Sequence, residues 1–267
     1  MSRAAGTKRI SDMGFSADWL ALREPVDQAA RDDNLLSRAA AAAGQGAIVL
    51  DLGCGTGSTA RAFGDASATW TWRFVDGDAG LLDIAHARHP ASECVRMNLR
   101  DIDDLPLEGV TLVTASALLD LMPAEWMACL ATRLRDAAVP FYAALNYDGV
   151  MAWSPKHQAD LDITKAFNTH QQTDKGIGPA MGPRSGEISA DILRDHGFTV
   201  SLADSPWRLG SAEVDLHAEL VSGIAEAAKE IGTCTAPEWA DARRDGIAQS
   251  SAIIGHTDLF ATPQKSQ

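Results

Sequence analysis

The chain has 267 residues, of which 46% are hydrophobic and 22% are charged, a composition typical of a folded globular protein. Its 23 Lys and Arg residues against 36 Asp and Glu residues give a net charge of −13, which opposes binding to nucleic acid and to anionic membrane surfaces. We therefore expect neither a nucleic-acid partner nor a membrane partner.

The sequence lacks the usual signals for export or membrane insertion. No segment reaches the ~20 apolar residues of a membrane span, and residues 1–19 lack the apolar core of a signal peptide. The four cysteines are widely spaced and form no CxxC pair, which argues against a zinc site or a disulfide framework. We expect a cytoplasmic protein without a bound metal, as a monomer or a homodimer.

Helices are expected to fill the first 44 residues. A short helix over residues 16–22 is predicted to break at Pro25, and a second helix over residues 27–43 to end at Gly44 and Gly46. Together they would form a helical cover ahead of the first strand.

Strands and helices then alternate as far as about residue 146. Short apolar, β-branched runs indicate buried strands, and the helices fall between them. This alternation favours parallel pairing with helices on both faces of one sheet. The expected strands are residues 47–52, 70–75, 94–97, 110–115 and 139–146, and the expected helices are residues 58–63, 79–88 and 124–137.

The last third departs from simple alternation. Helices are expected over residues 159–169 and 186–196, with strand 198–202 next and a helix marked by apolar spacing from His217 to Ile231. Thr235 and Glu238 have the spacing of a capping box for a further helix. Residues 251–260 read as a last strand that returns to the sheet.

These elements predict one α/β domain over residues 1–267. Its core would be a doubly wound, mostly parallel, Rossmann-like sheet of seven strands, with helical insertions after the fifth and sixth strands. We divide it into the helical cover (residues 1–44), a ligand-binding half (residues 45–150) and a substrate-side half (residues 151–267).

A glycine loop between the first strand and the next helix is the strongest functional signal. Gly53, Gly55 and Gly57 stand at alternate positions, where the lack of a Cβ lets a ligand approach the backbone. A dinucleotide fold would have a Gly or Ala at Ser58, and an acid at Asp51 would oppose a pyrophosphate. Nucleotide-dependent oxidoreduction is therefore the weaker interpretation.

The segment Asp51-Leu52-Gly53-Cys54-Gly55-Thr56-Gly57 resembles the first motif of class I S-adenosylmethionine (SAM)-dependent methyltransferases. The resemblance covers residues 45–145 and is only topological outside that span. It implies a methyltransferase that uses SAM as its cofactor. The loop contacts that it implies are Asp51, Gly53, Cys54 and Gly55.

The resemblance also implies cofactor contacts at the ends of later strands. Asp76, followed by Gly77, would hold the ribose, a role that an acid at the second strand end also has in dinucleotide folds. Adenine would meet Asn98-Leu99 or, in a second register, Asp101-Ile102. Ser116 would lie beside the methionine part. An arginine of the cover, Arg23 first and Arg31 second, would pair with the cofactor carboxylate.

The acceptor site is expected beyond the carboxyl ends of the strands. The stretch from Asn146 to Lys175 is polar and glycine-rich, which favours a functional connection over a plain surface loop. Within this edge we expect Tyr147 and His170 to face the transferable methyl group, with Asp120 across from them, as the catalytic residues.

The sequence thus predicts a SAM-dependent methyltransferase acting on a small-molecule acceptor. Two alternatives stay open, a SAM-binding protein that does not catalyse and an RNA or protein methyltransferase, of which RNA is disfavoured by the charge. Whether nitrogen, oxygen, sulfur or carbon is methylated is not decided by these residues.

Overall fold

The computed structural model describes residues 15–264. The expectation that residues 1–19 lack a signal peptide falls mostly on residues outside this range. Within residues 15–264, none of the helices is both long and apolar enough to cross a bilayer. Over the same part of the chain, no group of three or more His, Cys, Asp or Glu side chains is placed to hold a metal ion.

One eight-stranded sheet runs through the protein in the order β3-β2-β1-β4-β5-β8-β6, and β7 pairs with β8 at its side. The first five strands are parallel, and β8 is antiparallel to β5, β6 and β7. The predicted α/β fold class is confirmed, with one short strand more than expected. The strands are β1 (Ile48–Leu52), β2 (Thr71–Asp76), β3 (Glu93–Arg96), β4 (Leu112–Ser116), β5 (Phe141–Ser154), β6 (Phe198–Asp204), β7 (Trp207–Leu209) and β8 (Ser251–Pro263).

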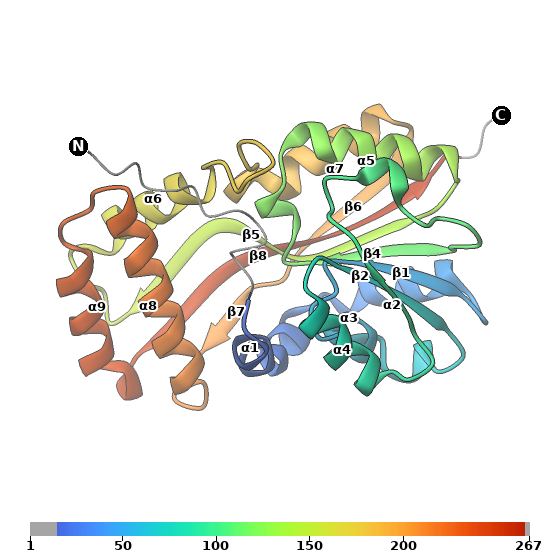
Figure 1. Ribbon diagram of the computed structural model, residues 1–267. Helices are drawn as coiled ribbons and strands as arrows, with labels where there is room; N and C mark the ends of the chain where they lie inside the picture. Colours follow the sequence, from blue (N-terminus) through green and yellow to red (C-terminus); the bar gives the residue numbers. More distant parts are fainter. Residues whose placement is uncertain (1–14, 265–267) are drawn as a thin grey trace, which may run out of the picture.

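Helices cover both faces of the sheet (Figure 1). On one face, the apolar sides of α5 (Ala124–Asp136) and α7 (Ser185–Asp195) join the core around Leu50, Val113 and Phe141. On the other, α2 (Asp33–Ala43), α3 (Ser58–Phe63) and α4 (Ala79–Arg88) pack on Val49 and Phe74. Because both faces are buried, the central strands are almost entirely apolar.

A third core lies beyond the end of the sheet, where the long strands β5 and β8 extend toward α8 and α9 (Figure 1). There α6 (Asp160–Gln171), α8 (Val214–Glu230) and α9 (Ala236–Asp245) pack around the fully buried Trp239. Thr235 precedes α9, but its side chain makes no capping hydrogen bond, so the predicted capping box is wrong.

The N-terminal cover breaks at a different place from the one predicted. Pro25 lies inside a continuous helix, α1 (Ala17–Ala30), and the break comes at Arg31, whose ψ of 142° leaves the helical region. Asp32 then caps α2, accepting a hydrogen bond from the backbone N–H of Leu35 at 2.7 Å. Glu24 and Asp27, on either side of Pro25, contact Arg61 and Trp207, and these contacts offset the one backbone hydrogen bond lost at the proline.

The first part of the predicted polar connection, residues 146–154, is strand. β5 continues to Ser154 because its residues pair with β8, including Tyr147 opposite His256, with register shifts on either side of that pair. Asn146 is buried and donates from Nδ2 to the Thr257 carbonyl at 2.9 Å. This segment is tied into the sheet and is not a free loop.

A buried carboxylate joins the cover to the centre of the sheet. Asp258 on β8 is fully buried and accepts hydrogen bonds from the backbone N–H of Leu145 (2.8 Å), the backbone N–H of Asp32 (3.0 Å) and the Tyr142 hydroxyl (3.2 Å). Leu145 has a φ of +58°, a left-handed conformation that an L-residue adopts only when its surroundings hold it there.

Replacing this carboxylate should therefore cost stability. We expect Asp258→Ala to lower the free energy of unfolding by about 3 kcal/mol, because it leaves three donors without their partner. The matched control is Asp195→Ala, at an exposed residue that ends α7, which should change it by less than ~0.5 kcal/mol. Urea unfolding of the three proteins measures the difference; equal stability of both variants would contradict this role.

Candidate functional site

The glycine loop joins β1 to α3 and has glycines where space and backbone angle both require them. Gly55 has a φ of +54°, and a Cβ there would lie 3.0 Å from Leu20 of α1. Gly57 has a φ of +79°, and its Cβ would lie 3.2 Å from both Phe74 and His89. Side chains at these positions would push away the elements that wall the loop.

A pocket of about 760 Å³ opens above this loop, at the carboxyl ends of β1, β2 and β4. Nine of the ten predicted cofactor contacts line it: Arg23, Gly53, Cys54, Gly55, Asp76, Gly77, Asn98, Leu99 and Ser116. The cover contributes a wall through α1, and Ile177 closes the pocket from the loop after α6. The residues predicted on the loop side are thus gathered around one pocket.

Asp76 ends β2 with its carboxylate in the pocket wall. Its Oδ2 accepts from the backbone N–H of Gly55 and its Oδ1 from that of Asp78, each at 2.9 Å. Burial raises the pKa of this carboxyl despite those hydrogen bonds. The other acid, Asp78, caps α4 by accepting from the N–H groups of Gly80 and Leu81, so the two acids have different roles in the structure.

The turn after β3 distinguishes the two adenine registers. Asn98 and Leu99 line the pocket, whereas Ile102 is buried in the core under α5. Trp126 fixes this turn by donating from Nε1 to the Leu99 carbonyl at 2.6 Å. The geometry favours the Asn98-Leu99 register.

Asp51 lies beneath the loop instead of lining the pocket. Its side chain is fully buried and its Oδ1 accepts from the Thr114 hydroxyl at 2.7 Å. Burial raises the pKa of Asp51 to about 7, although the Thr114 hydrogen bond and the nearby Arg31 charge lower it. The predicted direct contact is thus replaced by a supporting position under the glycines.

The cover also provides Asp27, a residue that the sequence did not single out. Asp27 is buried in the pocket wall and accepts from both Nε and Nη2 of Arg23, at 2.8 and 3.1 Å. It also accepts from Trp207 Nε1 at 2.9 Å, and the Arg23 guanidinium lies 4.9 Å above the Trp207 ring. Asp27 therefore sets the orientation of Arg23; its helical position carried no signal for a partner 180 residues away.

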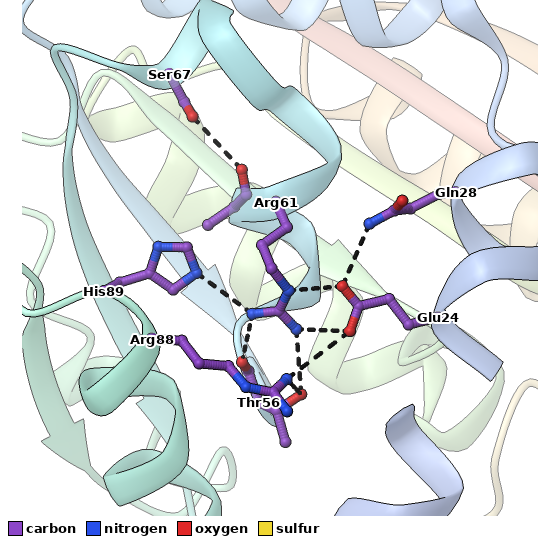
Figure 2. A network of polar contacts seen from close by, with 8 residues as sticks. Glu24, Gln28, Thr56, Arg61, Ser67, Arg88 and His89 are labelled. Carbon is purple, nitrogen blue, oxygen red and sulfur yellow. Dashed lines mark hydrogen bonds and ion pairs between the residues drawn. The ribbon is translucent and has the colours of Figure 1, made fainter. Parts of the chain in front are cut away.

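A cluster of polar side chains holds α1 onto the glycine loop (Figure 2). Arg61 of α3 forms a two-pronged ion pair with Glu24 of α1, at 2.6 and 2.7 Å. The same guanidinium donates to the Thr56 carbonyl of the loop at 2.8 Å. Arg88 and His89, at the end of α4, complete the cluster. This Glu24–Arg61 clasp keeps the pocket wall and the pocket floor in one geometry.

The three predicted catalytic residues do not converge. Asp120 is buried, with its Oδ1 unpartnered among the described residues, and burial raises its pKa to about 6 while Arg23 and Lys175 lower it. Its neighbours Leu121 and Met122 line the pocket. Asp120 thus lies directly behind the pocket residues Leu121 and Met122.

Tyr147 and His170 are not among the residues that line the pocket. The buried Tyr147 hydroxyl donates to Asn168 Oδ1 at 2.7 Å, and burial raises its pKa. His170 Nε2 lies 2.9 Å from Glu230 Oε2, which links α6 to α8. We predicted that His170 faces the pocket, but its side chain at the end of α6 contacts α8 instead.

The clasp yields a direct prediction. We expect Glu24→Ala to speed amide hydrogen exchange along α1 by an amount corresponding to about 1 kcal/mol, since a half-buried ion pair is lost and the helix opens more readily.

The matched control removes an exposed ion pair instead. Glu226 pairs with Lys229 at 3.3 Å on the surface of α8, and Glu226→Ala should leave exchange in α1 unchanged. Unaltered exchange in Glu24→Ala would show that the clasp does not hold the cover.

Comparisons with known proteins agree on one class. Residues 49–140 match the family model described as "Methyltransferase domain". No curated protein matches the chain. Among solved structures, cyclopropane synthase MmaA2 from Mycobacterium tuberculosis is 13% identical with a TM-score of 0.52, covering 96% of each chain. The YcgJ protein from Bacillus subtilis is 11% identical with a TM-score of 0.54, covering 88% of this chain and 100% of that one.

A third similar structure is a complex with ligands. The Haemonchus contortus phosphoethanolamine N-methyltransferase 2, in complex with phosphomonomethylethanolamine and S-adenosylhomocysteine (SAH), is 14% identical with a TM-score of 0.51, covering 98% of this chain and 61% of that one. At these identities the solved structures show the shared fold. The family-model match over the glycine loop and the strands beside it supports the predicted enzyme class, a SAM-dependent methyltransferase, and with it the predicted cofactor.

Proposed function

We propose that the protein transfers the methyl group to a small-molecule acceptor. The observation that carries the proposal is the set of elements around the pocket: Leu20 and Arg23 of α1, and Ile177 of the loop after α6, line the same pocket as the glycine loop. A concave site walled by several elements suits a small molecule. The net charge of −13 further disfavours RNA as the acceptor.

The residues of the pocket fit the cofactor. The glycines bring bare backbone to its floor, Asp76 presents carboxylate lone pairs for ribose hydroxyls, and Asn98-Leu99 provide the adenine side. Ser116 and Arg23 stand at the amino-acid end. When bound, the cofactor supplies a methyl group on a positively charged sulfur, and the chain's part is to orient the acceptor and exclude water.

Asp120 remains in this proposal as the catalytic residue. Of the three predicted, it alone adjoins residues that line the pocket, and its raised pKa places it near the range where a carboxylate can take a proton from an acceptor. Tyr147 lies close enough for the Asp120 charge to raise its pKa further, so we assign it a supporting position. His170 is withdrawn from the site.

For the domain, the compartment and the oligomeric state of the protein we keep the predictions made from the sequence. We propose a single methyltransferase domain in the cytoplasm, as a monomer or a homodimer. All four cysteines, Cys54, Cys94, Cys129 and Cys234, are free thiols, which supports a reducing compartment. The Haemonchus contortus enzyme, with phosphomonomethylethanolamine in its site, is an example of a small acceptor on this fold.

The direct test uses a metabolite extract and cofactor with a labelled methyl group. Label in a low-mass product supports the proposal. Label only in protein or RNA of the extract would favour the macromolecular alternative, and SAH binding without any labelled product would favour a SAM-binding protein that does not catalyse.

The ribose assignment gives one prediction. Asp76→Ala should weaken SAH binding by about 1.5–3 kcal/mol, as expected for hydrogen bonds to a charged group. Asp78→Ala serves as the comparison, because it removes the cap of α4 and should lower stability by about 1 kcal/mol. Calorimetry and thermal melts separate the two; unchanged affinity in a stably folded Asp76→Ala protein would reject the assignment.

The assignment of Asp120 gives another. A carboxylate that acts as a base must be ionised, so turnover should rise with pH through about 6 and then level off. Asp120→Asn should lower turnover at least about 100-fold and remove this rise, while SAH affinity changes little. His170→Ala is the control, and its turnover should equal that of the wild type. Equal turnover in Asp120→Asn would remove Asp120 from the mechanism.

A further inference from the structure

An arginine lies buried between the cover and the sheet, outside the pocket lining. Arg31 follows the last residue of α1 and is 6% exposed. Its Nη2 donates to Ser116 Oγ at 2.8 Å, while its Nε and Nη1 have no partner among the described residues. Removing a guanidinium from water is costly, so a buried arginine with one hydrogen bond needs another source of stabilisation.

Buried acids from three elements provide that stabilisation. Asp27 of α1, Asp51 of β1 and Asp258 of β8 are each close enough to interact electrostatically with Arg31. The Tyr142 hydroxyl also lies beside it. The surrounding charge thus keeps a protonated guanidinium at one place in the interior.

The hydrogen bond from Arg31 to Ser116 reaches the pocket. Ser116 ends β4 and lines the pocket, and its Oγ lies 3.1 Å from Thr59 Oγ1, in the first turn of α3. Thr59 in turn lies beside Asp51, whose pKa its hydroxyl lowers. The side chains of Arg31, Ser116 and Thr59 therefore form a row of hydrogen-bonded groups, which runs from the cover to the helix that follows the glycine loop.

The chemistry of the guanidinium decides which group donates in the hydrogen bond between Arg31 and Ser116. Arginine has five N–H donors and no acceptor, so Ser116 must accept from Arg31. The hydroxyl hydrogen of Ser116 is then available only for Thr59 or for a ligand in the pocket. Without Arg31, the Ser116 hydroxyl loses the donor that limits its rotation, and it can turn its hydrogen toward Thr59 Oγ1 and away from the ligand.

We propose that Arg31 is a positioning residue, which fixes the Ser116 hydroxyl as a hydrogen-bond donor toward an acceptor atom of the bound cofactor. The inference rests on the cofactor class and on the pocket position of Ser116. It assigns Arg31 a role through Ser116 and not through direct contact with the cofactor.

Calorimetric SAH binding to four proteins tests this role: wild type, Arg31→Met, Ser116→Ala and the double variant. Each single change should weaken SAH binding about 5- to 10-fold, the effect of one lost hydrogen bond. The double variant should bind as the Ser116→Ala variant does, because Arg31 has nothing left to position. A loss in the double variant equal to the product of the two single losses would overturn the proposal.

The control is another arginine–serine pair. Arg38 of α2 is exposed and donates to Ser201 Oγ at 3.0 Å, away from the pocket. Arg38→Met should leave SAH affinity unchanged; a loss equal to that of Arg31→Met would also overturn the proposal, because it would show a nonspecific effect.

Folding is checked by melting each protein. If Arg31→Met does not fold, Arg31→Lys replaces it, because lysine keeps the buried charge but lacks the planar reach to Ser116. The expectation is again weaker binding with no further loss on adding Ser116→Ala. Wild-type affinity in either folded Arg31 variant would contradict the proposal alone, whereas a wild type that does not bind SAH would contradict the cofactor assignment as well.

Discussion

The close approach of other elements to the glycine loop is the constraint on which the site depends. A Cβ at Gly55 would lie 3.0 Å from Leu20 of α1, and one at Gly57 would lie 3.2 Å from Phe74 and His89, so the neighbours would have to shift. Because the loop carries no side chains there, the Asp76 carboxylate can reach the Gly55 N–H, and Arg61 can hold the Thr56 carbonyl. The floor, the wall and the strand end are therefore joined by direct hydrogen bonds, and a shift of one would move the others.

Buried charge is the second organising feature, and it lies mainly where the cover meets the sheet. Asp27 holds Arg23 and Trp207, and Asp258 holds the turn before α2 and the left-handed Leu145. Each buried carboxylate satisfies donors from different elements, which offsets the cost of removing it from water. The contacts of Asp27 also fix Arg23 of α1 in the pocket wall.

Local signals were enough to predict the parallel half of the fold and most of the loop side of the pocket. The glycine spacing, the strand-end acid Asp76 and the cap at Asp78 act within a few residues of themselves, so the sequence shows them directly. The rest depends on distant partners. The continuation of β5 requires pairing with β8, the contact of Asp27 with Trp207 joins opposite ends of the chain, and His170 turns away because Glu230 lies on a helix 60 residues later. Pro25 within α1 shows the same limit, since Glu24 and Asp27 on either side of it contact residues distant in the sequence, Arg61 and Trp207.

The central claim is that this loop and pocket bind an adenosyl amino acid and not a dinucleotide. Calorimetric titration of the purified chain with SAH and, separately, with NAD tests it most directly. The account predicts saturable binding of SAH and no measurable heat from NAD binding, because Asp51 lies under the loop and Ser58 opens α3 where a dinucleotide fold has a glycine or alanine. Saturable binding of NAD without binding of SAH would contradict it.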